Sequence, residues 1–228
     1  MYSYTNCGRQ DAGDLSVPGR HYNPTWDPLR RRIPEDQLLV FNPTKGVLQI
    51  QEQQPHSDER KVDSDSLVLS IGGTCRNPGV RGARAAWSVY FGPGSPYNAS
   101  GLLDPTLPQT ELRAEIEALR QAMGIVNKIV SGDFRPRRCY IRTHSSYIQR
   151  VFPSLILRWA ADRGKNIFGE KVVFFQLLMD VENLMQEMGN GGEGGTDVRI
   201  WCATREENRE ADGLAVDAVA QSECKDSL

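Results

Sequence analysis

The chain has 228 residues, of which 39% are hydrophobic and 25% charged, and its net charge at neutral pH is −2. This composition is typical of one globular domain with segments left over, and the near-neutral charge argues against a protein that coats nucleic acid nonspecifically, although a local basic groove is compatible with it. The longest apolar stretches are too short to cross a bilayer, so we expect no membrane association.

The N-terminus has neither a basic start nor an apolar core, so we expect no secretory signal. The five cysteines form no CxxC pair and leave an odd one out. That pattern favours reduced thiols in an intracellular protein, in the cytoplasm or nucleus, over a disulfide framework. The three histidines lack metal-ligand spacing among themselves or with cysteine, so the sequence does not indicate a zinc site.

Residues 1–65 differ in composition from the rest of the chain. They are rich in proline, glycine, asparagine and charge, and residues 51–66 have no apolar period, which is typical of a polar linker. The apolar residues between Trp26 and Phe41 are enough to dock on a neighbouring surface and too few to fold alone. We therefore expect an N-terminal extension and linker that is partly docked or disordered.

Three strands are expected next, without helices between them. Residues 66–73 (SLVLSIGG) form an almost continuous apolar run, as in a central strand. Residues 83–91 alternate between apolar and polar side chains, which predicts a strand with one buried face. After a turn, residues 98–103 (NASGLL) predict a third, antiparallel strand.

The period then changes to that of helices. Thr110 is expected to cap a helix that runs through Val126 with its apolar residues on one face. The later elements are a strand at 137–143, a short helix stopped by Pro153, helices at 154–164 and 169–188, a strand at 198–204 and a helix at 208–221. The order βββαβαααβα predicts an α/β fold with helices packed on a mixed sheet.

Four motifs in this region resemble type 1 ribonuclease H. GGTCRNPG resembles the family's DGxCxxNG turn, and TELRAEIEAL resembles its TNxRAEhxA helix. RWAADRGKNIFGEKV resembles the basic handle region, and TREENREADGLA resembles the C-terminal segment. The resemblance covers roughly residues 66–222 in the family's order. It implies an RNase H-like fold there, with a five-stranded mixed sheet flanked by α-helices, and a tail at 223–228.

The resemblance also implies a chemistry. Such enzymes cut the RNA strand of an RNA–DNA hybrid with two Mg²⁺ ions, which four carboxylates hold. The four matching positions are Gly72, Glu115, His144 and Asp212. Glu115 and Asp212 remain as metal ligands and are expected to approach each other and Gly72 at the edge of the sheet. Mg²⁺ binding is therefore expected to be weak or lost.

The two substituted positions differ in what they offer. Gly72 has no side-chain ligand at the position that bridges both metals in the family. If the φ of Gly72 is negative, as a strand position implies, the backbone cost of replacing it with aspartate should be small. The imidazole of His144 suits zinc, copper or nickel better than Mg²⁺, and the simpler interpretation is a polar residue at a strand end.

The substrate-contacting positions are also altered. Glu111 and Leu112 replace a polar pair that contacts the hybrid in the family, and an acid there would repel phosphate. Phe174 and Phe175 lie where the handle usually carries polar residues. Candidate nucleic-acid contacts are Arg76, Asn77, Trp159, Arg163, Lys165, Lys171 and Arg205, with Trp159 a stacking or a packing ring.

Three hypotheses follow. The first is a catalytically defective RNase H-like monomer that binds an RNA–DNA hybrid or double-stranded RNA. The second is a weak hybrid endonuclease that uses Glu115, Asp212 and a non-standard ion at His144. The third is a protein-interaction module. Salt-dependent hybrid binding separates the first from the third, and a metal-dependent cleavage product separates the second from both.

Overall fold

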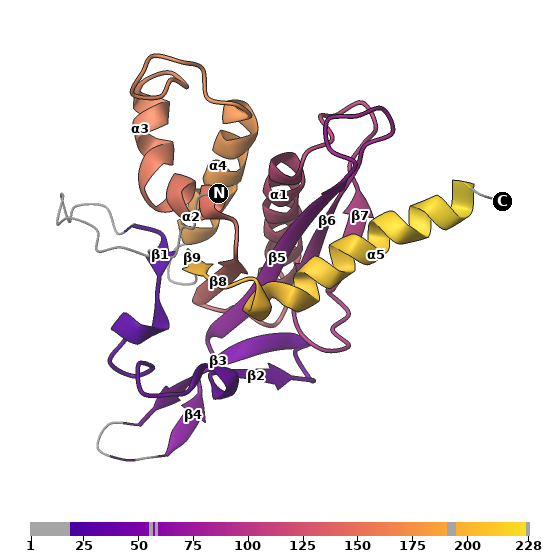
Figure 1. Ribbon diagram of the computed structural model, residues 1–228. Coiled ribbons are helices and arrows are strands. Elements are labelled where there is room, and N and C mark those ends of the chain that lie inside the picture. Colours follow the sequence, from indigo (N-terminus) through magenta and orange to yellow (C-terminus); the bar gives the residue numbers. More distant parts are fainter. Residues whose placement is uncertain (1–18, 55–56, 58, 191–194, 227–228) are drawn as a thin grey trace.

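The computed structural model describes residues 19–54, 57, 59–190 and 195–226 (Figure 1). The strands are β1 (His21–Tyr22), β2 (Leu39–Asn42), β3 (Val47–Gln53), β4 (Arg60–Val62), β5 (Ser66–Arg76), β6 (Arg84–Tyr90), β7 (Ala99–Leu102), β8 (Arg138–Thr143) and β9 (Asp197–Cys202). The helices are α1 (Glu111–Val130), α2 (Ser146–Arg150), α3 (Ile156–Ala161), α4 (Phe175–Gly189) and α5 (Arg209–Asp226). None of the helices in these ranges has the length and apolar character needed to cross a membrane.

The strands join in one mixed sheet of order β1-β9-β8-β5-β3-β2, and β6 and β7 continue from β5. The central strand β5 pairs in parallel with β8 from Ser66 to Ser70 and antiparallel with β6 from Ser70 to Arg76. β7 is antiparallel to β6, and β9 is parallel to β8. This arrangement confirms the expected mixed sheet that begins with three antiparallel strands.

Helices cover both faces of the sheet. Figure 1 shows α5 in front of β5 and β6, with α1 behind them. Thr110 caps α1 by accepting the Arg113 N–H, and the helix buries Ile116, Leu119 and Met123 completely. This 3–4 spacing produces the apolar stripe that packs on β5 and on α4. Each such side chain contributes roughly 1.5–3 kcal/mol through its burial.

The described residues before β5 extend the same sheet. β3 contacts β5 through the Leu48–Val68 pair, and β1 adds to the edge of β9. The expected linker at 51–66 instead contains the end of β3 and the whole of β4. Apolar periodicity did not indicate this hairpin, because a polar side chain, Gln49, takes a buried position in it. The Gln49 amide donates to the backbone carbonyls of Asp63, Ser64 and Ser66.

Two ion pairs, Arg138–Asp63 and Arg20–Glu182, hold this N-terminal segment against the rest of the domain. The Arg30 guanidinium is 3% exposed and contacts Asp63 at 2.8 Å, and Arg138 of β8 contacts the same carboxylate at 2.8 Å. Arg20 donates to both oxygens of Glu182, a buried residue of α4. A small second core of Tyr22, Ile33, Leu38, Ile50, Val68, Tyr140 and Trp201 lies beneath the segment.

Two helix boundaries differ from expectation. The chain does not leave the helical path at Pro153, because a π-helical turn at Val151–Leu155 joins α2 to α3. A wider turn accommodates the missing proline N–H. α4 begins at Phe175, later than expected, because residues 163–174 form a loop that is closed by a bridge between Lys165 and Lys171.

Candidate functional site

Three elements bring the candidate residues together. Glu111 and Glu115 lie one turn apart on α1, so they share a helical face. β8 ends at Thr143 and is followed directly by His144, while Asp212 lies in the first turn of α5. The family positions Glu115, His144 and Asp212 therefore meet near the end of β8, as expected from the motifs.

His144 lies between the acids. Its Nδ1 is 3.6 Å from Asp212 Oδ2, and a ligand atom of His144 lies within 4.8 Å of ligand atoms on Glu111 and Glu115. The Asn208 amide donates to Ile71 O at 2.9 Å and to Asp212 Oδ1 at 3.0 Å, which fixes Asp212 against β5. The Ser145 hydroxyl donates to Glu115 Oε2.

The acids are held in a poorly solvated environment. Burial raises the pKa of Glu115 to about 7; the charges of Glu111 and Asp212 act in the same direction, and the Ser145 hydrogen bond opposes them. Burial also raises the pKa of Asp212, against the opposing effects of His144, Asn208 and Arg205. Asp212 Oδ2 is buried without a hydrogen-bond partner among the described residues.

Gly72 is covered by the backbone of α5. A Cβ built on Gly72 would lie 2.9 Å from the Ala211 carbonyl carbon and 2.8 Å from Ser88 Oγ. Because the Ala211 atom belongs to the backbone, any side chain at this position requires α5 to move. Gly72 is not one of the glycines with a positive φ, so the small backbone cost of replacing it remains a prediction. The contacts with Ala211 and Ser88 add a steric cost that the sequence did not indicate.

Gly73 has the matching role on the other face of β5. A Cβ on Gly73 would lie 2.6 Å from the Glu115 nitrogen, so glycine lets α1 approach the strand closely. The two adjacent glycines thus place α1 and α5 close to β5 on opposite sides. Because neither glycine has a side chain, the first turns of α1 and α5 lie close to β5, which brings Glu115 and Asp212 toward each other.

The donor set does not fit the two-Mg²⁺ centre that the resemblance implies. Mg²⁺ prefers octahedral oxygen ligation, with several charged oxygens where two ions share a site. Here the bridging position is a covered glycine, and a nitrogen donor lies between the remaining acids. Glu115 and Asp212 alone supply too few oxygens to hold two ions.

The candidate nucleic-acid contacts fall into three exposed groups and one buried ring. Arg76 and Asn77 follow β5, where Arg76 forms an ion pair with Glu223 of α5. Trp159 is 8% exposed and faces Tyr147 in the core, which favours the packing interpretation of this ring. The remaining cations, in the loop before α4 and in the segment before α5, are Arg163, Lys165, Lys171 and Arg205.

The described structure adds site residues that the motifs did not single out. Glu111, expected only to repel phosphate, points its carboxylate toward Glu115 and His144. Asn208 and Ser145 hold Asp212 and Glu115 in place. Two features of the sequence could have indicated these residues. Glu111 lies four residues before Glu115, and Asn208 lies inside the REEN-x-EAD string.

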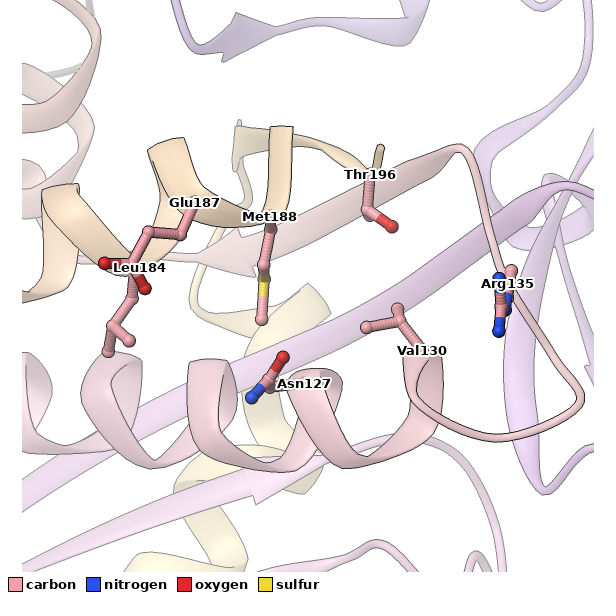
Figure 2. Close-up of a pocket in the computed structure, with 7 residues that line it drawn as sticks. All are labelled: Asn127, Val130, Arg135, Leu184, Glu187, Met188 and Thr196. Atoms are coloured by element: carbon pink, nitrogen blue, oxygen red, sulfur yellow. The ribbon is translucent and has the colours of Figure 1, made fainter. Parts of the chain in front are cut away.

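A separate pocket of about 310 Å³ lies at the opposite end of α1 (Figure 2). Asn127 and Val130 come from the last turns of α1, and Leu184 and Met188 come from the end of α4. Glu111 is in the first turn of α1, so this pocket is not part of the candidate site.

Glu115→Gln tests the electrostatic description. A carboxyl whose pKa is raised from 4.5 to about 7 binds more protons in the folded state, so stability falls as pH rises from about 4.5 to 7. In chelator-treated buffer, Glu115→Gln should gain roughly 2 kcal/mol over the parent between pH 5 and pH 8, measured by urea unfolding. The exposed Asp217→Asn is the control and should follow the parent. Parallel pH profiles for Glu115→Gln and the parent would contradict the description.

Comparison with known proteins agrees with the motifs. No protein-family model matches the sequence. Ribonuclease H1 of Rattus norvegicus is 27% identical over 171 residues, and that of Homo sapiens is 28% identical; each match covers 70% of this chain. The chain spans about half of these relatives, since 52% of each is covered.

A solved structure supports the fold independently. The foamy viral protease-reverse transcriptase, solved in complex with an RNA/DNA hybrid, aligns with a TM-score of 0.51 at 14% identity. The alignment covers 82% of this chain and 23% of the viral one. The motifs, the mixed sheet and these matches together show an RNase H-like fold and a similarity to ribonuclease H1 over 171 residues.

Proposed function

We propose that this chain binds an RNA–DNA hybrid and that its cleavage activity is lost or strongly impaired. The observation that carries the proposal is the α5 backbone, which lies on Gly72 where the family places its metal-bridging carboxylate. Without that carboxylate, position 72 offers no oxygen that could bridge two metal ions. Cleavage would then lack the pair of ions that stabilises the attacking and leaving oxygens.

Hybrid binding is supported by the placement of the cations. In Figure 1 the turn between β5 and β6 and the loop between α3 and α4 extend from the same end of the molecule. The first turn of α1 lies near this loop, since the Arg113 guanidinium is 5.9 Å from the centre of the Phe174 ring. Arg76 at the end of β5 and Lys165 and Lys171 in the loop before α4 therefore lie at this end of the molecule.

Cations on two separate elements suit a duplex whose backbone is contacted at more than one point. An A-form duplex would be recognised by its shape and 2′-hydroxyls, with phosphates as the anions. The similarity to ribonuclease H1 supports an RNA–DNA hybrid as the partner. The viral protein was solved with such a hybrid and also with double-stranded DNA. Affinity is expected to be low, because Glu111 opposes phosphate and Glu223 already neutralises part of Arg76.

Charge reversal of Glu111 tests the binding surface. Glu111→Lys should strengthen binding of a labelled hybrid by about three- to tenfold at low salt, and the gain should fade as salt rises. Fluorescence anisotropy over a salt series measures both effects. Glu59→Lys is the matched control, because this exposed residue precedes β4 at the other end of Figure 1 and changes net charge equally. Equal effects of the two variants would show that hybrid does not bind at the proposed surface.

Substitution of Gly72 by alanine tests the steric argument without adding charge. Gly72→Ala should destabilise the fold by about 1–3 kcal/mol, because the new Cβ meets the α5 backbone. Gly124→Ala is the control: this α1 glycine has open space around its Cβ position, so alanine should stabilise the helix by up to about 1 kcal/mol. Chemical denaturation compares the two. A Gly72→Ala variant as stable as the parent would contradict the steric argument, since it would mean that α5 leaves room for a side chain at this position.

A further inference from the structure

We propose that Glu111, Glu115 and His144 form a binding site for one divalent transition-metal ion of the Zn²⁺ type. Among the residues that the structure describes, this is the only group of three acidic, histidine or cysteine side chains with ligand atoms within 4.8 Å of one another. The inference concerns the same site as the proposed function and relies on it only for the view that the two-Mg²⁺ centre is absent.

The donor set selects the metal. Two carboxylate oxygens and one imidazole nitrogen are hard and borderline ligands, which Zn²⁺ accepts with bonds of about 2.0–2.2 Å. Three protein ligands with an open fourth position are typical of catalytic zinc sites. For mixed nitrogen and oxygen ligands, affinity rises from Mn²⁺ toward the end of the first transition row, so Zn²⁺ should bind more tightly than Mn²⁺.

The three side chains are placed so that their ligand atoms can move close enough together to coordinate one ion. Glu111 is exposed in the first turn of α1, so its side chain can rotate to bring its carboxylate nearer. Glu115 is held by Ser145 through one oxygen, and its other oxygen accepts no hydrogen bond from a described residue. His144 is fixed at the end of β8 and is partly open to solvent. An ion would therefore enter from the Glu111 side.

The residues behind His144 form an outer shell. A metal-bound histidine usually donates its other ring N–H to a carboxylate. Asp212 Oδ2 is buried without a hydrogen-bond partner among the described residues and lies 3.6 Å from His144 Nδ1, so a shift of a few tenths of an ångström completes that bond. Asn208 Nδ2 also lies 3.2 Å from His144 Nδ1, but its two hydrogens have closer acceptors in Ile71 O at 2.9 Å and Asp212 Oδ1 at 3.0 Å. Nδ1 is thus left to donate to Asp212, and Nε2 is left for the metal.

This arrangement gives Asp212 a different role from the one implied by the family. Asp212 acts as a positioning residue for His144 and does not touch the ion. A dication in front of it also offsets the repulsion among Glu111, Glu115 and Asp212, which contributes to the predicted affinity.

Calorimetric titration of Zn²⁺ into the chelator-treated whole chain, without nucleic acid, tests the site. We expect one ion per chain at this site and at least tenfold weaker binding in Glu111→Gln and in His144→Ala. Mg²⁺ should bind at least a hundredfold more weakly. Glu111→Gln is the decisive variant, because an exposed side chain can be changed without disturbing the fold.

Two control variants show whether Zn²⁺ binds elsewhere on the chain. Cys202 Sγ lies 3.3 Å from His21 Nε2, and Cys202→Ser should leave Zn²⁺ affinity at the proposed site unchanged. Glu210→Gln removes a nearby exposed acid of α5 and should also have no effect. In the Zn²⁺-loaded parent, nitrogen NMR should show His144 protonated at Nδ1 with Nε2 bound to the ion, and Asp212→Asn should weaken that signature.

The outcomes are separable from those of the proposed function. Zn²⁺ binding that is absent, or that survives both Glu111→Gln and His144→Ala, would overturn this inference and leave hybrid binding untouched. Zn²⁺ binding with the expected variant pattern, in a chain that does not bind hybrid, would support the metal site and refute the proposed function.

Discussion

The close packing of α5 on β5 at Gly72 is the constraint on which the candidate site depends. Glycine lets the first turn of the helix lie against the strand, where the Ser88 hydroxyl donates to Ala211 O and the Asn208 amide donates to Ile71 O. These contacts fix Asp212 and, through it, the surroundings of His144. A Cβ at Gly72 would meet the Ala211 backbone and Ser88 Oγ, so a side chain at this position and this placement of α5 exclude each other.

The remaining acids are then held without the ligands that a pair of Mg²⁺ ions requires. Burial of Glu115 and Asp212 disfavours their charged forms, and the neighbouring Glu111 adds repulsion. Such an arrangement lowers stability at neutral pH unless a cation compensates it. An imidazole between carboxylates changes the preferred cation. Mg²⁺ prefers oxygen ligands, whereas Zn²⁺ also accepts nitrogen.

Sequence reasoning could predict the sheet from residues 66 onward, because apolar periodicity and four motifs in order specify both elements and topology. It could not predict the strands before β5, since Gln49 supplies a core position with a polar side chain whose amide is satisfied internally. The motifs located Glu115, His144 and Asp212, whereas the contribution of Glu111 depends on side-chain direction. The spacing of histidines and cysteines could not indicate the proposed metal site, because its single histidine joins two glutamates from another element. The cost of a side chain at Gly72 also lay outside sequence reasoning, because it arises from the α5 backbone 139 residues later at Ala211.

The most direct test of impaired cleavage is an assay of the whole chain on an RNA–DNA hybrid with a labelled RNA strand, in Mg²⁺ and separately in Mn²⁺. The expected result is an intact RNA strand in both ions, at protein concentrations where the hybrid is bound. Any contaminating nuclease would act equally in preparations of Glu115→Gln and Asp212→Asn. A metal-dependent product formed by the parent and abolished in both variants would contradict the central claim, since it would mean that these two acids complete an active centre without a carboxylate at position 72.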